Sequence, residues 1–202
     1  MVDFFVQGGG FMWPILIALL FGLAVIGERA YSLINSSSDT DQFFEEVKTI
    51  YSDSGKEQAI EFCENSPGPV ASIFYAGLSK MEKTKEEVEK AVQNAGGLEM
   101  AFLEKNMIWI NSVITIAPML GFTGTVVGMI KAFEDIKMAN DISPAVVAGG
   151  ISQALLTTAF GLIVAMIMQV AQNFFVSMID KLILDMEEQS IKIVEYLHSS
   201  KK

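Results

Sequence analysis

Cysteine and histidine are nearly absent from this chain of 202 residues, and their scarcity excludes several kinds of chemistry. Cys63 is the only cysteine, so no internal disulfide can form, and we expect a reduced thiol with a packing role. His198 is the only histidine, and we expect it to be solvated. The charged parts also contain no phosphate-binding glycine loop and no nucleophile elbow. We therefore expect no enzyme, no cofactor and no metal site.

Charged residues are missing from three long windows, which cover residues 4–27, 106–130 and 142–179. Each window exceeds the roughly 20 residues that carry a helix across a hydrocarbon core about 30 Å thick. Apolar residues make up 51% of the chain, and the mean hydropathy is +0.40. The sequence therefore predicts three transmembrane helices, one in each window.

Basic residues are scarce on one side of this predicted membrane protein. The N-terminal tail has none, and the connection between the second and third spans has only Lys131 and Lys137. Because basic residues are retained on the cytoplasmic side, we expect the N-terminus outside and the C-terminus inside. The predicted parts are a periplasmic tail over residues 1–11, transmembrane helices over 12–34, 106–133 and 144–178, a cytoplasmic helical region over 35–105, a periplasmic turn over 134–143 and a cytoplasmic C-terminal helix over 179–202.

The overall charge excludes one class of partner. The chain has 14 basic and 24 acidic residues, which gives a net charge of −10. Such a charge argues against nucleic acid as a partner. Most acidic residues fall in the predicted cytoplasmic parts, where they indicate a solvated surface.

Residues 35–105 alternate between helical patterns and polar or proline-rich breaks. Four apolar residues recur at the spacing of a short amphipathic helix: Phe43, Phe44, Val47 and Ile50. Ser54 with Glu57 fits a capping box that would start a second helix. Residues 70–81 form a third pattern, after a Pro-Gly-Pro break at 67–69. We expect a small cytoplasmic cluster of helices here.

Two of the predicted spans continue as helical patterns beyond the membrane. Thr84 with Glu87 fits a second capping box, and the pattern then stays helical as far as Phe133, about 75 Å at 1.5 Å per residue. Ser143 and Pro144 are good first residues for the third helix, whose apolar period of 3.6 persists beyond residue 180. The predicted fold class is an all-α membrane protein with three transmembrane helices, two of them extended far into the cytoplasm.

Small residues form one stripe on each of the last two spans. The first stripe is Ala117, Gly121, Thr125, Gly128 and Ala132, and the second is Gly150, Ala154, Thr158, Gly161 and Ala165. A spacing of three or four places each stripe on one helix face, where small residues allow close helix packing in a membrane. Gly124 with Gly128 adds a GxxxG pattern. Packing alone is one explanation of these stripes.

Polar residues accompany the stripes, and ionisable ones do not. Thr123, Thr125, Thr157, Thr158 and Gln153 are expected at similar depths, although their hydroxyls can also bond to their own helices. Proton pumps and antiporters normally place an ionisable group at this depth, and the membrane part of these spans has none. If this protein moves ions, another chain has to supply the titrating group.

Two segments carry a family resemblance. Residues 117–133 read Ala-Pro-Met-Leu-Gly-Phe-Thr-Gly-Thr-Val-Val-Gly-Met-Ile-Lys-Ala-Phe, and residues 150–162 read Gly-Ile-Ser-Gln-Ala-Leu-Leu-Thr-Thr-Ala-Phe-Gly-Leu. With Trp13-Pro14-Ile-Leu and Glu28-Arg29 in the first span, the chain resembles the ExbB/TolQ/MotA ion-channel family, and within it ExbB and TolQ most.

The resemblance implies a homopentamer in the bacterial inner membrane, built around the membrane helices of an ExbD- or TolR-like single-span partner. That partner supplies a membrane aspartate, which the residues matching Thr125 and Thr158 face. The resemblance also implies a TonB- or TolA-like protein as a further partner. Pore-lining residues would then be Thr125, Thr158, Thr157 and Gln153, and the packing residues of the wall would be Gly121, Gly124, Gly128, Ala154, Gly161 and Pro118.

The chain departs from the family pattern at two places. Gln153 stands where ExbB and TolQ often have glutamate, and no proline follows Val164-Ala165, so we expect an unbroken third helix. Two alternatives stay open: a flagellar-type, MotA-like stator subunit, and a non-conducting membrane scaffold. The sequence does not choose between proton and sodium as the ion.

Overall fold

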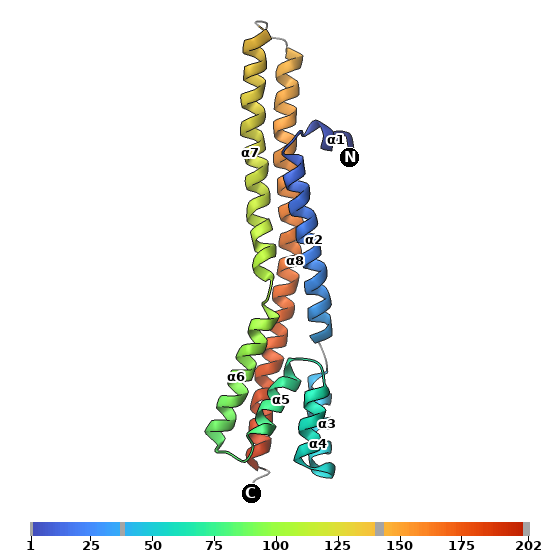
Figure 1. Ribbon diagram of the computed structural model, residues 1–202, viewed down its shortest axis with the longest axis vertical. Helices are drawn as coiled ribbons and strands as arrows, with labels where there is room; N and C mark the ends of the chain where they lie inside the picture. The colour runs from blue at the N-terminus through green and yellow to red at the C-terminus, as the bar shows by residue number, and fades with distance from the viewer. Residues whose placement is uncertain (1, 37–38, 140–143, 200–202) are drawn as a thin grey trace. The chain divides into compact units, whose positions relative to one another are not determined.

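A computed structural model describes residues 2–36, 39–139 and 144–199. Every regular element in these ranges is an α-helix (Figure 1), which confirms the predicted all-α class. Three helical segments are long and apolar enough to cross a membrane, namely Met12–Ser36, Lys85–Met138 and Ala148–Ser199. The helices are α1 (Val2–Gln7), α2 (Met12–Ser36), α3 (Thr40–Ser54), α4 (Lys56–Asn65), α5 (Pro69–Ser79), α6 (Lys85–Leu103), α7 (Met107–Ala139) and α8 (Pro144–Ser199).

Helices α2, α7 and α8 continue past residues 34, 133 and 178, so the membrane boundaries placed there stay predictions. The expected N-cap Ser143 and most of the expected periplasmic turn lie outside the described residues.

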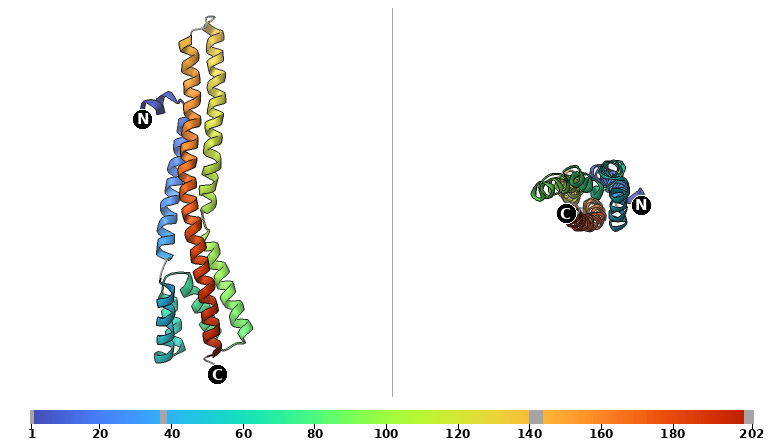
Figure 2. Two further views of the ribbon diagram at one scale, coloured as in Figure 1. Left: turned by 180° about the vertical axis from the view of Figure 1, so that it is seen from behind. Right: turned by 90° about the horizontal axis from the view of Figure 1, so that it is seen from below.

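The chain divides into two compact units. The first unit contains the chain up to Glu28 and Asn106–Phe174, and the second contains Arg29–Lys105 and the chain from Phe175 onward. In the first unit α2, α7 and α8 run side by side in both views (Figures 1 and 2). A Cβ added at Gly22 of α2 would lie 2.5 Å from the Sδ of Met168 and 3.5 Å from Val113, so this glycine admits α8 and α7 close to α2.

The expected continuous helix from Thr84 to Phe133 is interrupted. Helix α6 ends at Leu103 and α7 begins at Met107, whereas the glycine pair in α6 and Pro118 in α7 interrupt neither helix. Asn106 in the break has a φ of 65°, a left-handed conformation that asparagine tolerates better than most residues. Within the first unit its Nδ2 also donates to Oε2 of Glu28 over 3.2 Å, which fixes its side chain.

A buried arginine accounts for the end of α6 in the second unit. Arg29 is only 1% exposed, and its Nη1 donates to the carbonyl oxygens of Phe102 and Leu103, each at 3.5 Å. The last carbonyls of a helix have no partner within it, and a cation there also complements the helix dipole. Arg29 therefore stabilises the point where α6 stops.

The two expected capping boxes have different outcomes. The box at Thr84 is confirmed, because Glu87 N donates to Thr84 Oγ1 over 3.3 Å and Thr84 N donates to Glu87 Oε2 over 3.1 Å. The box at Ser54 is wrong, since Ser54 is the last residue of α3 and α4 has no side-chain cap. Gly55, with a φ of 91°, makes the turn between the two helices instead.

Aromatic rings form the centre of the second unit. Phe74 of α5 is fully buried, with ring centroids 5.6 Å from Phe43 and 5.7 Å from Phe44 of α3. Tyr196 of α8 lies 6.1 Å from Phe44. Cys63 of α4 is also buried, and its burial raises the pKa of the thiol to about 12, which agrees with the expected packing role.

Helix α8 continues through the second unit to Ser199, which confirms the helical pattern expected beyond residue 180. Its buried side chains there are Phe175, Ile179, Leu182, Met186, Ile193, Val194 and Leu197. This periodic face packs against the rest of the unit.

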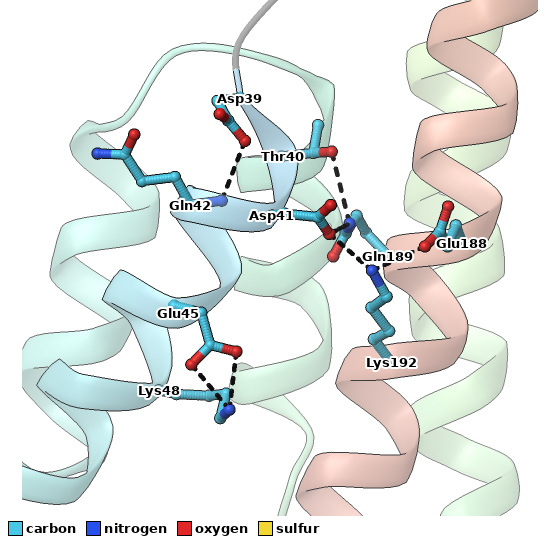
Figure 3. Close-up of polar contacts among 9 residues, drawn as sticks. All are labelled: Asp39, Thr40, Asp41, Gln42, Glu45, Lys48, Glu188, Gln189 and Lys192. Carbon is cyan, nitrogen blue, oxygen red and sulfur yellow. Dashed lines mark hydrogen bonds and ion pairs between the residues drawn. The ribbon is translucent and has the colours of Figure 1, made fainter.

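Polar contacts join α8 to the start of α3 (Figure 3). The buried Gln189 donates from Nε2 to Asp41 Oδ1 over 2.9 Å, and Lys192 Nζ lies 2.6 Å from the same oxygen. The hydrogen bond from Lys192 is the largest reason why the pKa of Asp41 lies below its usual value, and Asp41 in turn raises the pKa of Lys192. These contacts fix the register between the two helices.

The two capping sites lead to a paired prediction. Thr84→Ala removes the side-chain acceptor at the start of α6 and should lower the free energy of unfolding by about 1 kcal/mol. Ser54→Ala removes a hydroxyl that caps no helix and should change it much less. Thermal unfolding of the purified protein, followed by circular dichroism, compares the variants. Equal losses for both would show that the Thr84 cap does not stabilise the fold.

Candidate functional site

The two stripes of small residues face each other in the first unit. A Cβ added at Gly161 of α8 would lie 2.5 Å from the carbonyl oxygen of Ala117, and one added at Gly121 of α7 would lie 2.8 Å from that of Thr157. Distances this short leave no room for a side chain, so the backbones of α7 and α8 are in direct contact. At this contact Gly121 and Gly161 bring the two helices together.

The same close packing continues along both helices, which run in opposite directions (Figure 1). A Cβ at Gly124 would lie 2.6 Å from Thr157 Oγ1, and a Cβ at Gly128 would lie 3.1 Å from Ala154 Cβ. The glycines of the GxxxG pattern are therefore both used between α7 and α8 of one chain.

Three threonine hydroxyls meet where the helices touch. Thr125 Oγ1 and Thr158 Oγ1 are hydrogen-bonded to each other across the contact. Thr158 Oγ1 also donates to the carbonyl oxygen of Gly121 over 3.0 Å, and Thr157 Oγ1 donates to that of Ala154 over 2.7 Å. We call Thr125, Thr157 and Thr158 the threonine cluster.

The threonine cluster has more acceptors than its protons can use at once. Thr125 Oγ1 lies 3.2 Å from the carbonyl oxygen of Gly121 and 3.1 Å from that of Ala154, besides its bond to Thr158. A hydroxyl carries one proton and two acceptor lone pairs, so each can change partner by rotating. Thr157 is 1% exposed, whereas Thr125 and Thr158 are partly exposed. The cluster can therefore donate to a carboxylate or accept from a hydrated ion beside it, without itself titrating.

Two members of the expected polar band lie elsewhere. Thr123 is exposed, and its Oγ1 donates to the carbonyl oxygen of Met119 over 2.8 Å, within its own helix. The side-chain amide of Gln153 lies against Gly9, where an added Cβ would be 2.0 Å from Nε2. Gly9 has a φ of 73°, a left-handed conformation that favours glycine. The contact between Gly9 and Gln153 was not predicted from the sequence, although the run Gly8-Gly9-Gly10 was an available signal.

Pro118 and the segment after the second stripe also have definite places. Pro118 lies inside α7, about two turns before Thr125, and α7 continues through it. Helix α8 is unbroken over residues 164–168, as the missing proline predicted. No group of three or more His, Cys, Asp or Glu side chains that could hold a metal occurs among the residues that the structure describes.

Comparison with known proteins gives consistent matches. The model of the MotA/TolQ/ExbB proton channel family matches residues 65–188. A Synechocystis protein with an ExbB-like biopolymer transport name is 28% identical over 188 residues, which cover 92% of this chain and 90% of that protein. An ExbB homologue of Methanothermobacter thermautotrophicus is 28% identical over 180 residues, covering 89% and 64%. The Tol-Pal system protein TolQ of Pseudomonas aeruginosa is 29% identical over 125 residues, covering 55% and 54%.

The backbone contact between α7 and α8 leads to a second prediction. Gly161→Ala forces a methyl group against the Ala117 carbonyl and should destabilise the protein by about 1–3 kcal/mol, the usual cost of overpacking. Gly149→Ala is the matched control on the same helix, because nothing lies within 4 Å of its added Cβ. Detergent-purified variants are compared by thermal unfolding. The described packing would be contradicted if Gly161→Ala were as stable as Gly149→Ala.

Proposed function

Because this chain belongs to the MotA/TolQ/ExbB proton channel family, we propose that it is the pore-wall subunit of an ion-driven motor in the bacterial inner membrane. The family match and the three apolar segments make it a multi-pass membrane protein. The motor would use an ExbD- or TolR-like single-span partner to couple ion flow to work in the cell envelope. The N-terminus would be periplasmic and the C-terminus cytoplasmic, with α6 and the end of α8 in the cytoplasm.

The threonine cluster is the observation that carries this proposal. It places hydroxyls at a partly exposed point on α7 and α8, in windows that contain no charged residue. A titrating group is needed for proton transport at this depth, and nothing in these windows can serve as one. A carboxylate from the partner would therefore complete the site.

The mechanism follows from what hydroxyls and carboxylates can do. An ion enters from the periplasmic side and binds the partner carboxylate, which Thr125 and Thr158 solvate while it is charged. Once neutralised, the carboxylate needs these hydroxyls less and can move past them. The transmembrane potential supplies about 2.3 kcal/mol per charge per 100 mV, which drives rotation of the partner against the wall. Gln153, which lies next to Gly9, would line the ion path on the periplasmic side of the threonine cluster.

Several copies of the chain are needed to enclose a partner. The resemblance to ExbB and TolQ supports a homopentamer with the lipid bilayer outside it, and supports a TonB- or TolA-like protein acting downstream of the partner. The choice between proton and sodium depends on how the carboxylate and the threonine cluster are hydrated together.

A non-conducting scaffold is the second candidate, and one observation favours it. Every hydroxyl of the threonine cluster has a hydrogen-bond partner within the chain. These bonds alone could account for the three threonines, as a role in helix packing requires. The scaffold and the pore wall differ in what happens when these hydroxyls are replaced by a methyl group of the same shape.

Threonine-to-valine substitutions provide that test. Thr158→Val and Thr125→Val should each lower ion flux through the purified complex by roughly 10- to 100-fold, the equivalent of one hydrogen bond to a charged group. Thr123→Val is the matched control, because this hydroxyl only bonds within its own helix, and its flux should stay near the original. Flux is measured with a pH-sensitive or sodium-sensitive dye in vesicles. Normal flux in Thr158→Val, at equal complex yield, would support the scaffold instead.

A further inference from the structure

Four amide side chains lie on α7 and α8 of the first unit, away from the threonine cluster. Gln169 of α8 donates from Nε2 to Asn173 Oδ1 over 2.9 Å, and both residues are exposed. Gln172 lies in the same turn, and its buried Oε1 accepts no hydrogen bond from the residues that the structure describes. Asn111 of α7 is also exposed. We call Asn111, Gln169, Gln172 and Asn173 the amide cluster.

The two helices bring their amides to nearly the same depth. A Cβ added at Gly22 would lie 2.5 Å from Met168 Sδ and 3.5 Å from Val113 Cγ1, so Met168 of α8 and Val113 of α7 are level. Gln169 follows Met168 by one residue, and Asn111 precedes Val113 by two. These steps are about 1.5 Å and about 3 Å along the helices, and both lead away from the threonine cluster. The exposed amides of α7 and α8 are therefore close in depth.

The amide cluster lies on the same helix faces as the threonine cluster. At about 100° per residue, Gln169 is rotated by about 20° from Thr158, and Asn111 is rotated by about 40° from Thr125. The helical rise separates the two clusters by about 16 Å along α8 and about 21 Å along α7. Leu162, which is 48% exposed, lies on this face of α8 between the two clusters. This face therefore has two polar levels with an apolar level between them.

The opposite faces of both helices are apolar at the depth of the amide cluster. Ile167, two residues before Gln169 and so on the other side of α8, is 45% exposed. Trp109, two residues before Asn111, is 51% exposed, and its ring centroid lies 6.1 Å from that of Phe21 in α2. Apolar and tryptophan side chains suit lipid and its interface, whereas an amide without a partner in lipid is costly. This division indicates that water faces the amide cluster and lipid faces the other side.

We propose that the amide cluster is the release site, through which the ion leaves the partner's carboxylate for the cytoplasm. The inference rests on the proposed function, because it requires that carboxylate at the threonine cluster. An amide side chain has a carbonyl acceptor and two N–H donors, so the cluster can order water molecules that accept a proton. Its carbonyl oxygens are also suitable ligands for a hard cation such as sodium. The unpartnered Oε1 of Gln172 is an acceptor that such a water molecule or cation would satisfy.

Labelling of single cysteines in the assembled complex tests whether water reaches the amide cluster. Cys63→Ala removes the native thiol, after which Gln169→Cys and Ile167→Cys place one cysteine on each side of α8 at matched depth. A charged methanethiosulfonate reagent that does not cross the membrane is applied from the cytoplasmic side. It should label Gln169→Cys at least roughly 10-fold faster than Ile167→Cys, because an apolar medium keeps a thiol protonated and unreactive. Equal rates at the two positions would overturn the inference.

Ion flux through the reconstituted complex tests the role in release. Gln169→Leu and Asn111→Leu remove an amide at similar size and should each lower the maximal flux by roughly 2- to 10-fold, the equivalent of one hydrogen bond. The external ion concentration that gives half-maximal flux should not rise, because ions still enter at the threonine cluster. Gln169→Asn keeps an amide and should recover most of the flux. Ser112→Ala is the matched control at this depth, because its hydroxyl donates to the Ile108 carbonyl in its own helix.

The outcomes separate this inference from the proposed function. Unchanged maximal flux when Gln169→Leu and Asn111→Leu are combined, while Thr158→Val still lowers flux, would overturn the release site and leave the proposed function in place. A higher half-saturating ion concentration in the leucine variants would assign the amides to ion entry and overturn it as well. If the leucine variants assembled poorly, the labelling rates of the cysteine variants would decide. A complex of unchanged sequence that carried no flux would contradict both proposals.

Discussion

The contact between the backbones of α7 and α8 is the constraint on which the rest of the first unit depends. Gly121 and Gly161 bring each helix against a carbonyl group of the other, and only glycine permits this approach. The approach in turn places Thr125 within hydrogen-bonding reach of Thr158 and of the Ala154 carbonyl. In lipid, where apolar surface gives little drive for association, close packing and such hydrogen bonds are what hold helices together. The residues that hold α7 and α8 together therefore also form the candidate site.

Because the residues that pack α7 against α8 also form the candidate site, the proposed pore wall could take part in ion transport without ionisable residues of its own. Hydroxyls satisfied by carbonyls cost little in a membrane, whereas a buried carboxylate would be expensive in every copy of the chain. If the partner supplies the carboxylate, the free-energy cost of placing a charge in the membrane arises at only one or a few carboxylates per complex. The exposed sides of Thr125 and Thr158 keep lone pairs available, because each hydroxyl has alternative donors and acceptors nearby. Under the proposed function, these hydroxyls would form a polar track that a charged group of the partner can pass along.

Local patterns predicted most of this arrangement, and contacts between distant residues account for what they missed. The stripes and the threonine pair were predicted because helical spacing alone puts them on one face. The end of α6 was missed, since it depends on Arg29, which lies 73 residues before Phe102 in the chain. Gln153 was assigned to the polar band by depth, but its place is set by Gly9 at the other end of the sequence. The capping box predicted at Ser54 is wrong because α3 extends to Ser54, and Gly55, which has a positive φ, makes the turn to α4.

The central claim is that this chain conducts ions only together with a carboxylate from another protein. It is tested most directly by reconstituting the chain into vesicles alone, with its single-span partner, and with the partner's membrane aspartate changed to asparagine, and then measuring ion flux under an applied potential. The account predicts flux with the unchanged partner only. Equal flux from the chain alone, or from the complex with the asparagine partner, would contradict it.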